Sequence, residues 1–385
     1  MRLQGRVFKI RWTYYLLWLL FSISCSVVIS CSGSDAPMVK TVKLECKESV
    51  SGDFMNLCDT VFFERLLFPD TVTFGLVTSL KRMGRFTCLA SVNTNSLICY
   101  EGNSFRYHLH RIGGGMGEYL TLHAFAIDTL KNELMIYDRT QFKVCYYDLK
   151  SGNFKCEQKY RRWVSNIEFL DAAHQVITMD YDEKSYLQVV DREFNHLQAS
   201  LATEYPLITD AVFPASFSYI DSSLYYAEPF NEVIYRITNK AIVPYLKIDF
   251  GTSVFPKTNW KSTDTEQVEQ RLQKGEYAFM VNLVSERNNV INFFHYYTPT
   301  SHHLVRYNQK TGHTEQFKNV SEEIKENSIP FPMACYQNMY LKPVYPDELN
   351  RSNPTLWWNR SDILRNIPVG TEANTILLLN YRLAQ

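Results

Sequence analysis

Short apolar runs, separated by polar segments rich in Gly, Asn, Asp and Ser, recur along most of the chain. Six of these runs resemble one another, and we interpret each as the second strand of a repeated unit. They are SLICYEG, ELMIYDR, QVITMDY, SLYYAEP, NVINFFH and NMYLKPV, centred near Ile98, Ile136, Ile177, Tyr225, Ile291 and Tyr340. β-Branched and aromatic side chains dominate them, and such side chains suit pleated, buried strands. The pattern predicts an all-β chain.

The spacing of these runs predicts the fold. Their centres lie 38, 41, 48, 66 and 49 residues apart, and most are followed by a third strand, such as KVCYYD or HLVRYN, and by a turn toward a fourth. Four short strands at this period are typical of a β-propeller blade. We therefore predict a six-bladed β-propeller with four-stranded antiparallel blades over residues 43–385. A sandwich or barrel is the alternative, but a sandwich rarely exceeds about 250 residues as one unit.

Two further segments fit this architecture. The longest gap contains STDTEQVEQRLQKGEY, residues 262–277, in which Thr263 and Glu266 have the spacing of a capping box, so we expect a short helix inserted between blades. The strand near Val61–Leu67 is expected to pair with the C-terminal TILLLNYRL. Such pairing would close the ring and leave no exposed sheet edge.

The glycine-rich stretch IGGGMGEY lies between a predicted outer strand, 103–112, and a predicted inner strand, 122–128. A dinucleotide-binding loop or a P-loop would open a helix, and here a strand follows, so phosphate binding is not expected. We interpret Gly113, Gly114, Gly115 and Gly117, with Glu118 and Tyr119, as a blade-to-blade connection that needs positive φ at several glycines.

The N-terminus has the pattern of a secretory signal. MRLQGRVFKIRW is basic and contains no acid, TYYLLWLLFSISCSVVIS is apolar or small, and CSGSDAP follows. This order is typical of an export signal, so we expect residues 1–30 to be removed. An uncleaved membrane anchor is the alternative.

The segment Val28-Ile29-Ser30-Cys31 resembles a bacterial lipobox. The resemblance implies cleavage before Cys31 and acylation of Cys31, whereas Cys25 fits less well because no aliphatic residue stands three places before it. Two or three acyl chains would anchor the protein stably to a membrane. Residues 31–42 then form a flexible tether, and Ser32, in place of an acid, implies the outer membrane. Whether the protein faces the periplasm or the outside stays open.

The blade connection also resembles a known family. IGGGMGEY is similar to the G-x-G-P-G-E-Y connection of six-bladed β-propeller lipoproteins of Bacteroides-type bacteria, relatives of the NHL and TolB-like propellers. GDFMNLCDTVFFERLLFP resembles the opening strand of that family, and EANTILLLNYRL resembles its closing strand. The resemblance covers nearly the whole mature chain and implies an exported, lipid-anchored propeller. It supplies no catalytic residues.

Acidic residues recur where the predicted second strands end. They are Glu101, Asp138, Asp180 and Glu228, and His295 takes this place in the fifth unit. Acids that enter a turn often accept backbone N–H bonds, which is a structural role. If these residues instead converge at one mouth of the channel, their oxygens could bind Ca²⁺ or a cationic or sugar ligand. Both interpretations stay open here.

Few other side chains suggest a site. Trp260, Trp357 and Trp358 lie in segments outside the repeat, where a Trp can stack on a sugar or a partner, or pin an insertion onto the ring. His108 and His110 would share one face of a strand, whereas His302 and His303 would face opposite ways. No metal ligands can be assigned from these spacings.

Two pairs of cysteines have the same spacing. Cys88 and Cys99 flank the turn SVNTNS, and Cys145 and Cys156 flank DLKSGN. In a tight hairpin either pair could face across two strands and form a disulfide, or could simply fill the core as small apolar residues.

Composition excludes one function class. The chain contains 40 Lys and Arg against 40 Asp and Glu, without the basic excess of a nucleic-acid-binding protein. No G-x-S-x-G, H-E-x-x-H or C-x-x-C motif occurs, and we assign no catalytic residue. We expect a monomeric module, without a required cofactor, that binds a protein, peptide or glycan at the outer membrane. The alternatives are a metal-dependent hydrolase or lyase with its site at one channel mouth, and a sensor or assembly partner.

Overall fold

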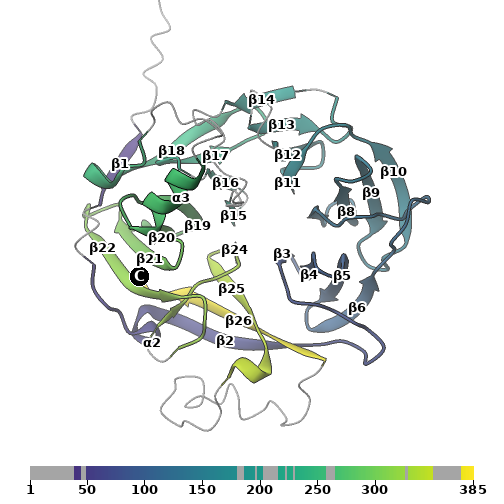
Figure 1. Ribbon diagram of the computed structural model, residues 1–385, viewed down its shortest axis with the longest axis horizontal. Coiled ribbons are helices and arrows are strands. Elements are labelled where there is room, and N and C mark those ends of the chain that lie inside the picture. Colours follow the sequence, from purple (N-terminus) through teal and green to yellow (C-terminus); the bar gives the residue numbers. More distant parts are fainter. Residues whose placement is uncertain are drawn as a thin grey trace, which may run out of the picture. The chain divides into compact units, whose positions relative to one another are not determined.

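Six blades of mainly antiparallel strands surround one axis and form the predicted six-bladed β-propeller (Figure 1). A single parallel bridge between β15 and β24 joins blades 4 and 6 into one nine-stranded sheet. The computed structural model describes residues 39–44, 49–179, 186–195, 197–202, 216–221, 223–228, 230–256, 265–325, 328–349 and 374–385. The ring belongs to the unit Thr41–Gln385. The predicted signal, Cys31, Asp180, Trp260, Trp357 and Trp358 lie outside the described residues. Within these residues, no helix combines the length and the apolar character needed to cross a bilayer.

The first three blades each contain four strands in simple chain order. From the axis outward, blade 1 contains β3 (Ser79–Met83), β4 (Phe86–Ser91), β5 (Ser96–Glu101) and β6 (Ser104–Leu109). Blade 2 contains β7 (Ala124–Asp128), β8 (Glu133–Asp138), β9 (Lys143–Asp148) and β10 (Phe154–Lys159). Blade 3 contains β11 (Val164–Phe169), β12 (His174–Met179), β13 (Leu187–Asp191) and β14 (Leu197–Leu201).

The other three blades carry additions. Blade 4 contains β15 (Ser216–Ile220), β16 (Ser223–Ala227), β17 (Val233–Ile237) and β18 (Ile242–Asp249), with β1 (Lys40–Lys43) beside β18. Blade 5 contains β19 (Phe279–Arg287), β20 (Val290–Thr298), β21 (Ser301–Asn308), β22 (Thr314–Ser321) and the short β23 (Ile329–Pro330). Blade 6 contains β24 (Ala334–Tyr336), β25 (Met339–Val344), β26 (Thr375–Leu383) and β2 (Cys58–Leu67). Within the described residues, the first strand begins at Lys40, inside the predicted tether.

Blade 6 closes the ring by joining the two ends of the chain. β2 pairs antiparallel with β26 along its length, from Cys58 opposite Leu383 to Leu67 opposite Thr375. This is the predicted pairing, and Figure 1 shows the two strands side by side. The helical turn α2 (Phe54–Leu57) leads into β2. Because the outermost strand of the last blade comes from the N-terminal part, opening the ring requires breaking a full strand pair.

The core is a series of layers between blades. Six apolar clusters each fill one interface between adjacent blades, and a seventh lies beneath α3 (Thr265–Gln273). In β8, Leu134 and Ile136 pack toward blade 1, whereas Met135 and Tyr137 pack toward blade 3. Since both faces of such a strand are buried, its sequence is a continuous apolar run.

The predicted helical insertion is confirmed. α3 lies inside the expected segment 262–277, in the connection from β18 to β19. Its Val268 and Leu272 are buried against Phe255 and Phe279. Short 3₁₀ turns follow β18 at Gly251–Ser253 and β25 at Pro346–Glu348.

One strand assignment was wrong. SLICYEG forms β5, the third strand of blade 1, because the inner strand β3 precedes the β4 hairpin. β3 has the sequence SLKRM, and its two charged residues interrupt the apolar pattern that marks the other strands. Glu101 therefore ends a third strand and lies at the opposite end of its blade from a second-strand residue such as Asp138.

Candidate functional site

The two ends of the ring differ in the length of their connections. At the end where the first and third strands finish, which we name the short-loop end, the connections within blades span two to five residues. All longer connections leave the second and fourth strands, at what we name the long-loop end. The longest of these run over residues 68–78, 110–123, 202–215, 250–278, 322–333 and 345–374. Long loops on a rigid scaffold are where binding residues commonly reside.

Tryptophans concentrate in the connections of the long-loop end. Trp163 lies between β10 and β11, is half exposed, and has the guanidinium of Arg139 4.1 Å from its ring centroid. Phe142 packs edge-on against it at 5.8 Å. Trp260 belongs to the 250–278 connection, and Trp357 and Trp358 belong to the 345–374 connection, by their places in the sequence.

The glycine-rich stretch is a blade-to-blade connection, as predicted, between β6 and β7. Its amides already have partners in the protein: Gly115 N–H donates to Glu118 Oε2 at 2.8 Å, Gly117 N–H donates to Glu157 Oε2 at 3.1 Å, and Gly113 N–H donates to the Tyr119 carbonyl at 3.1 Å. Since these donors are engaged, the loop offers no phosphate cradle.

The reason for the glycines is partly different from the one predicted. Only Gly117 has a positive φ, of 70°. At Gly113 and Gly115 a Cβ atom would collide with the Glu118 carboxylate, whereas at Gly114 it would make an ordinary contact with Gln141 Oε1 at 3.7 Å. A side chain at either position would therefore require the Glu118 carboxylate to move away from its hydrogen bond with Gly115 N–H. Tyr119 anchors the loop, because its buried hydroxyl donates to the carbonyls of Leu109 at 3.0 Å and Asn95 at 3.1 Å.

Asp138 organises the turn of its own blade. Its carboxylate accepts hydrogen bonds from the N–H groups of Leu120, Thr140 and Gln141, and from the side chains of Thr121 and Gln141, at 2.7–3.2 Å. Burial opposes its ionisation, but these hydrogen bonds outweigh burial and hold the pKa of Asp138 below its usual value. The carboxylate is thus engaged as a structural cap.

The other described candidates also have local partners. Glu101 pairs with Arg106 and lies 3.6 Å from Arg85 at the short-loop end, and Glu228 accepts a hydrogen bond from Asn231 Nδ2 at 2.9 Å. His295 is fully buried in blade 5. Within the described residues, no three His, Cys, Asp or Glu side chains come close enough to hold a metal ion. The described candidates therefore form no common site at one mouth of the channel.

The histidines follow the predicted strand geometry. His108 and His110 share a face, with parallel rings 5.8 Å apart. His302 packs on Tyr296 and Phe331, whereas His303 packs on His295. Burial lowers the pKa of His295 to about 3, and the neighbouring His303 adds to this. Burial likewise lowers the pKa values of His302 and His303 to about 4, so all three are neutral at pH 7.

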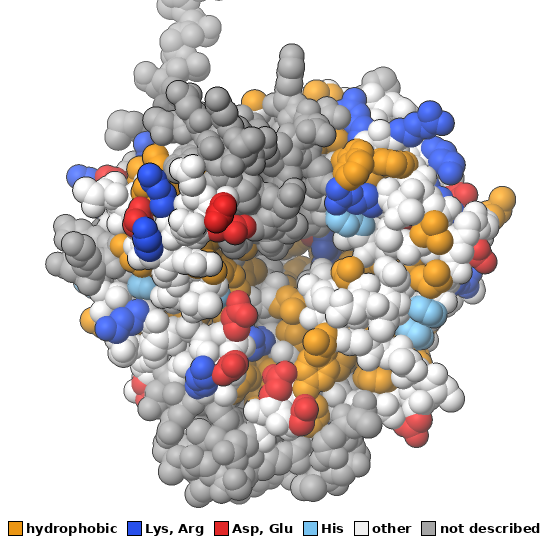
Figure 2. All heavy atoms as spheres, in the orientation of Figure 1, with side chains coloured by type: hydrophobic (Ala, Val, Ile, Leu, Met, Phe, Trp, Pro, Cys, Tyr) orange, Lys and Arg blue, Asp and Glu red, His pale blue; other side chains and the backbone are white. Residues whose placement is uncertain are grey.

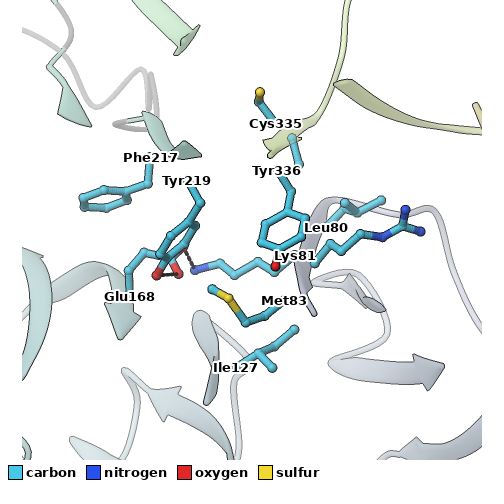
Figure 3. Close-up of a pocket in the computed structure, with 11 residues that line it drawn as sticks. Leu80, Lys81, Met83, Ile127, Glu168, Phe217, Tyr219, Cys335 and Tyr336 are labelled. Carbon is cyan, nitrogen blue, oxygen red and sulfur yellow. Dashed lines mark hydrogen bonds and ion pairs between the residues drawn. The ribbon is translucent and has the colours of Figure 1, made fainter. Parts of the chain in front are cut away.

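Charged side chains that the sequence did not single out meet across the channel (Figure 3). Lys81 of β3 forms an ion pair with Glu168 of β11 at 2.6 Å, and its ammonium also donates to Asn166 Oδ1 at 2.9 Å and to the Ile167 carbonyl at 2.8 Å. The hydroxyl of Tyr219, from β15, donates to the Phe169 carbonyl at 2.6 Å. We name Lys81, Glu168 and Tyr219 the channel closure; it links blades 1, 3 and 4.

A fourth inner strand, β24, contacts the residues around the channel closure. Tyr336 of β24 forms a parallel bridge with Tyr219, and its hydroxyl accepts a hydrogen bond from the Gly84 N–H of blade 1 at 2.8 Å. The closure lies near the C-terminal ends of the inner strands, toward the short-loop end. The cavity beside it has a volume of about 40 Å³, which holds a few water molecules but no sugar ring. Viewed down the axis, the ring has a hollow at its centre (Figure 2).

The charges of the closure depend on one another. Burial lowers the pKa of Lys81, and the Glu168 carboxylate opposes this shift. Burial raises the pKa of Tyr219, and Glu168 raises it further. No sequence signal identified this group, because Lys81 and Glu168 lie in different blades and only the ring brings them together.

Neither cysteine pair is bonded in the structure, where Cys88, Cys99, Cys145 and Cys156 are free thiols. The pairs nevertheless differ in geometry. The Cys88 and Cys99 sulfurs are 3.3 Å apart, whereas Cys145 is opposite Glu157 and Cys156 is exposed and opposite Tyr146.

Comparison with known proteins supports the architecture. A family model described as a 6-bladed beta-propeller matches residues 40–343. A Bacteroides fragilis protein described as exported has a similar structure, with a TM-score of 0.67 and 17% identity over 90% of this chain and 100% of its own. A DUF4221-family protein of Bacteroides vulgatus has a TM-score of 0.53 and 10% identity over 85% of this chain and 98% of its own. No curated protein matches the chain.

Proposed function

This chain belongs to the DUF5128 family of 6-bladed β-propellers, and from that premise we propose that it is an exported, lipid-anchored binding or scaffolding module. The ligand, a protein, peptide or glycan, binds at the long-loop end of the ring. The N-terminal signal pattern and Cys31 support export and anchoring. The similar Bacteroides fragilis protein, described as exported, is consistent with this proposal.

The distribution of tryptophan carries the proposal. The sequence contains six Trp, of which Trp12 and Trp18 belong to the predicted signal. The remaining four, Trp163, Trp260, Trp357 and Trp358, all belong to connections that leave the long-loop end. Tryptophan combines a large apolar face with an N–H donor, and it therefore suits stacking on a sugar ring or a partner side chain.

The features of the channel favour a binding site at the end of the ring over a binding site inside the channel. The channel closure places paired charges across the channel near the short-loop end, and the cavity of about 40 Å³ beside it is too small for a glycan or peptide. The metal-dependent hydrolase or lyase required converging acids, and the described acidic candidates are each engaged by residues close to them. We therefore retain binding as the function and propose that the ring acts as a monomer.

Binding is tested with the mature chain on glycan and peptide arrays, followed by calorimetry on any ligand found. The combined variant Trp260→Ala, Trp357→Ala, Trp358→Ala is expected to weaken binding at least about tenfold, since stacked aromatics dominate such contacts. Leu130→Ala is the matched control, because Leu130 is 74% exposed but lies at the short-loop end. Unchanged binding by the Trp variant, or equal loss in the control, would refute the proposed site.

Anchoring is tested separately by fractionation and fatty-acid labelling. Cys31→Ser is expected to abolish acylation and leave the signal uncleaved at this site, while Cys25→Ser leaves both unchanged. Acylation that persists in Cys31→Ser would contradict the assignment of Cys31 as the lipidated residue.

A further inference from the structure

The two cysteine pairs of blades 1 and 2 have the same spacing in the sequence. Only in blade 1 do the two cysteines stand opposite each other in the hairpin. In blade 1, β4 pairs with β5 without interruption, and Cys88 stands directly opposite Cys99. Both side chains are fully buried and both point into the apolar layer between blades 1 and 2. Their sulfur atoms are 3.3 Å apart.

The backbone hydrogen bonds show which kind of cross-strand pair this is. The Ala90 carbonyl accepts from Thr78 N–H, so Ala90 directs its backbone groups toward β3. The Arg85 carbonyl accepts from Gly102 N–H, so odd-numbered residues here face β5. Cys88, two residues from Ala90, therefore also faces β3. It forms a non-hydrogen-bonded pair with Cys99, which is the pair type with the closer Cα atoms and side chains.

Blade 2 lacks this geometry because of a β-bulge. The register of β9 and β10 shifts between Phe154 and Cys156, so Cys156 is opposite Tyr146 and Cys145 is opposite Glu157. A shift of one residue moves a side chain to the other face of a sheet. Consistent with this, Cys145 is buried and Cys156 is exposed.

We propose that Cys88 and Cys99 are a modification site, at which export converts the two thiols into a cross-strand disulfide within blade 1. The proposal depends on the export stated above, because disulfides form and persist in oxidising compartments. The separation of directly opposite residues in a non-hydrogen-bonded pair falls within the range that a disulfide needs. The two sulfurs need only move together within the layer that they already share.

The reaction is a balanced thiol–disulfide exchange. One Cys thiolate attacks the disulfide of a donor, such as oxidised glutathione or a protein disulfide, and releases one donor thiolate. The other Cys thiolate then attacks the mixed disulfide and releases the second. The two cysteines lose two protons and two electrons, and the donor is reduced to two thiols.

Burial determines when this exchange occurs. Burial, and then the neighbouring Cys99, raises the pKa of the Cys88 thiol well above its usual value. A neutral thiol without access to a donor exchanges slowly. The bond therefore forms during folding, before blade 2 covers the pair, and the folded reduced protein resists oxidation.

Peptide mapping of alkylated protein tests the proposal without a variant. The mature chain is unfolded and reduced, and it is then refolded with reduced and oxidised glutathione. It is next blocked with iodoacetamide under denaturing conditions, so that buried thiols react, and is digested. We expect one linked peptide joining Cys88 and Cys99, while Cys145 and Cys156 each carry the alkyl group. Reduction of the bond is expected to lower the Tm by about 5 °C, because the bond closes a short loop in the unfolded chain. Alkylation of both Cys88 and Cys99 in correctly refolded protein would overturn the proposal.

A second sample separates this proposal from the proposed export. Protein made from the full-length chain in its own cells is blocked before lysis and mapped in the same way. A linked pair in both samples supports both proposals. A pair that links on refolding but stays reduced in cells would leave the geometry standing and contradict export. Free thiols in both samples would refute the disulfide itself.

Discussion

The two ends of the ring are held in different ways. At the short-loop end, the channel closure joins inner strands of separate blades, from Lys81 in blade 1 to Glu168 in blade 3 and Tyr219 in blade 4. At the long-loop end, Asp138 caps a turn beside its own blade, and Glu228 bonds to a residue three positions away. The channel closure thus joins blades that are not neighbours in the ring, whereas these two long-loop candidates bond to residues close to them.

The largest expected effect comes from breaking the channel closure. Glu168→Leu leaves the Lys81 ammonium mostly buried without its carboxylate, which should cost about 3–5 kcal/mol of unfolding free energy. The double variant Lys81→Met, Glu168→Leu removes both charges and should regain most of this loss. Urea unfolding at pH 7 measures both. A loss below about 1 kcal/mol in the single variant would show that the pair does not hold the inner strands together.

The second effect is acid sensitivity at the histidines of blade 5. In the folded protein, three histidines have pKa values below the usual 6.5. The pKa is about 3 for His295 and about 4 for His302 and His303. Their contribution to stability is therefore complete above pH 6.5 and is lost as the pH falls through the folded pKa values. We expect a loss of about 3 kcal/mol for each of these histidines between pH 7 and pH 4, as an order of magnitude.

Two variants test whether a buried histidine causes this dependence of the unfolding free energy on pH. His295→Gln should flatten the dependence of unfolding free energy on pH, whereas His313→Gln, at an exposed position, should leave it unchanged. An identical slope in both variants would show that His295 does not contribute to the acid sensitivity.

The third effect is local to one turn. Asp138→Asn keeps the shape of the side chain but removes its charge and weakens its set of hydrogen bonds, and we expect a loss of about 2 kcal/mol. Because the folded pKa of Asp138 is depressed, this contribution is present above the unfolded pKa and disappears as the pH falls through the folded value. Unfolding at pH 7 and pH 3 measures it. Glu101→Gln, which changes a surface ion pair, is the control and should have no measurable effect.

Sequence reasoning reached the parts of this molecule that repeat. The period of the apolar runs predicted six blades, and the apolar TILLLNYRL predicted the ring closure with β2. It failed where partners are distant. β3 was missed as a strand because Lys81 and Arg82 break its apolar pattern, yet Lys81 is neutralised by Glu168 and Arg82 by Glu64 in β2. Misplacing β3 also put Glu101 at the wrong end of its blade.

The glycine-rich connection shows that sequence reasoning can also miss contacts between residues that are close in the sequence. Its position between blades followed from the flanking strands, and IGGGMGEY carried the family resemblance. The sequence could not show that Glu118 folds back over Gly113 and Gly115, because that contact depends on the loop's own path. Likewise, equal spacing made the two cysteine pairs indistinguishable until the bulge before Cys156 separated them.

The smallest expected effect on stability is that of a change at Trp163. It tests most directly whether the two ends of the ring have different roles. Trp163→Ala removes a half-exposed ring that touches Arg139 and Phe142, so the loss should stay below about 1 kcal/mol. If the long-loop end is the binding end, the same change should weaken ligand binding while the Tm barely moves. The Lys81→Met, Glu168→Leu variant should do the reverse and bind normally with altered stability. Unfolding by urea and calorimetric binding on both proteins decide this. A large loss of stability in Trp163→Ala would mean that the long-loop end also holds the ring together, and the division between the two ends would not stand.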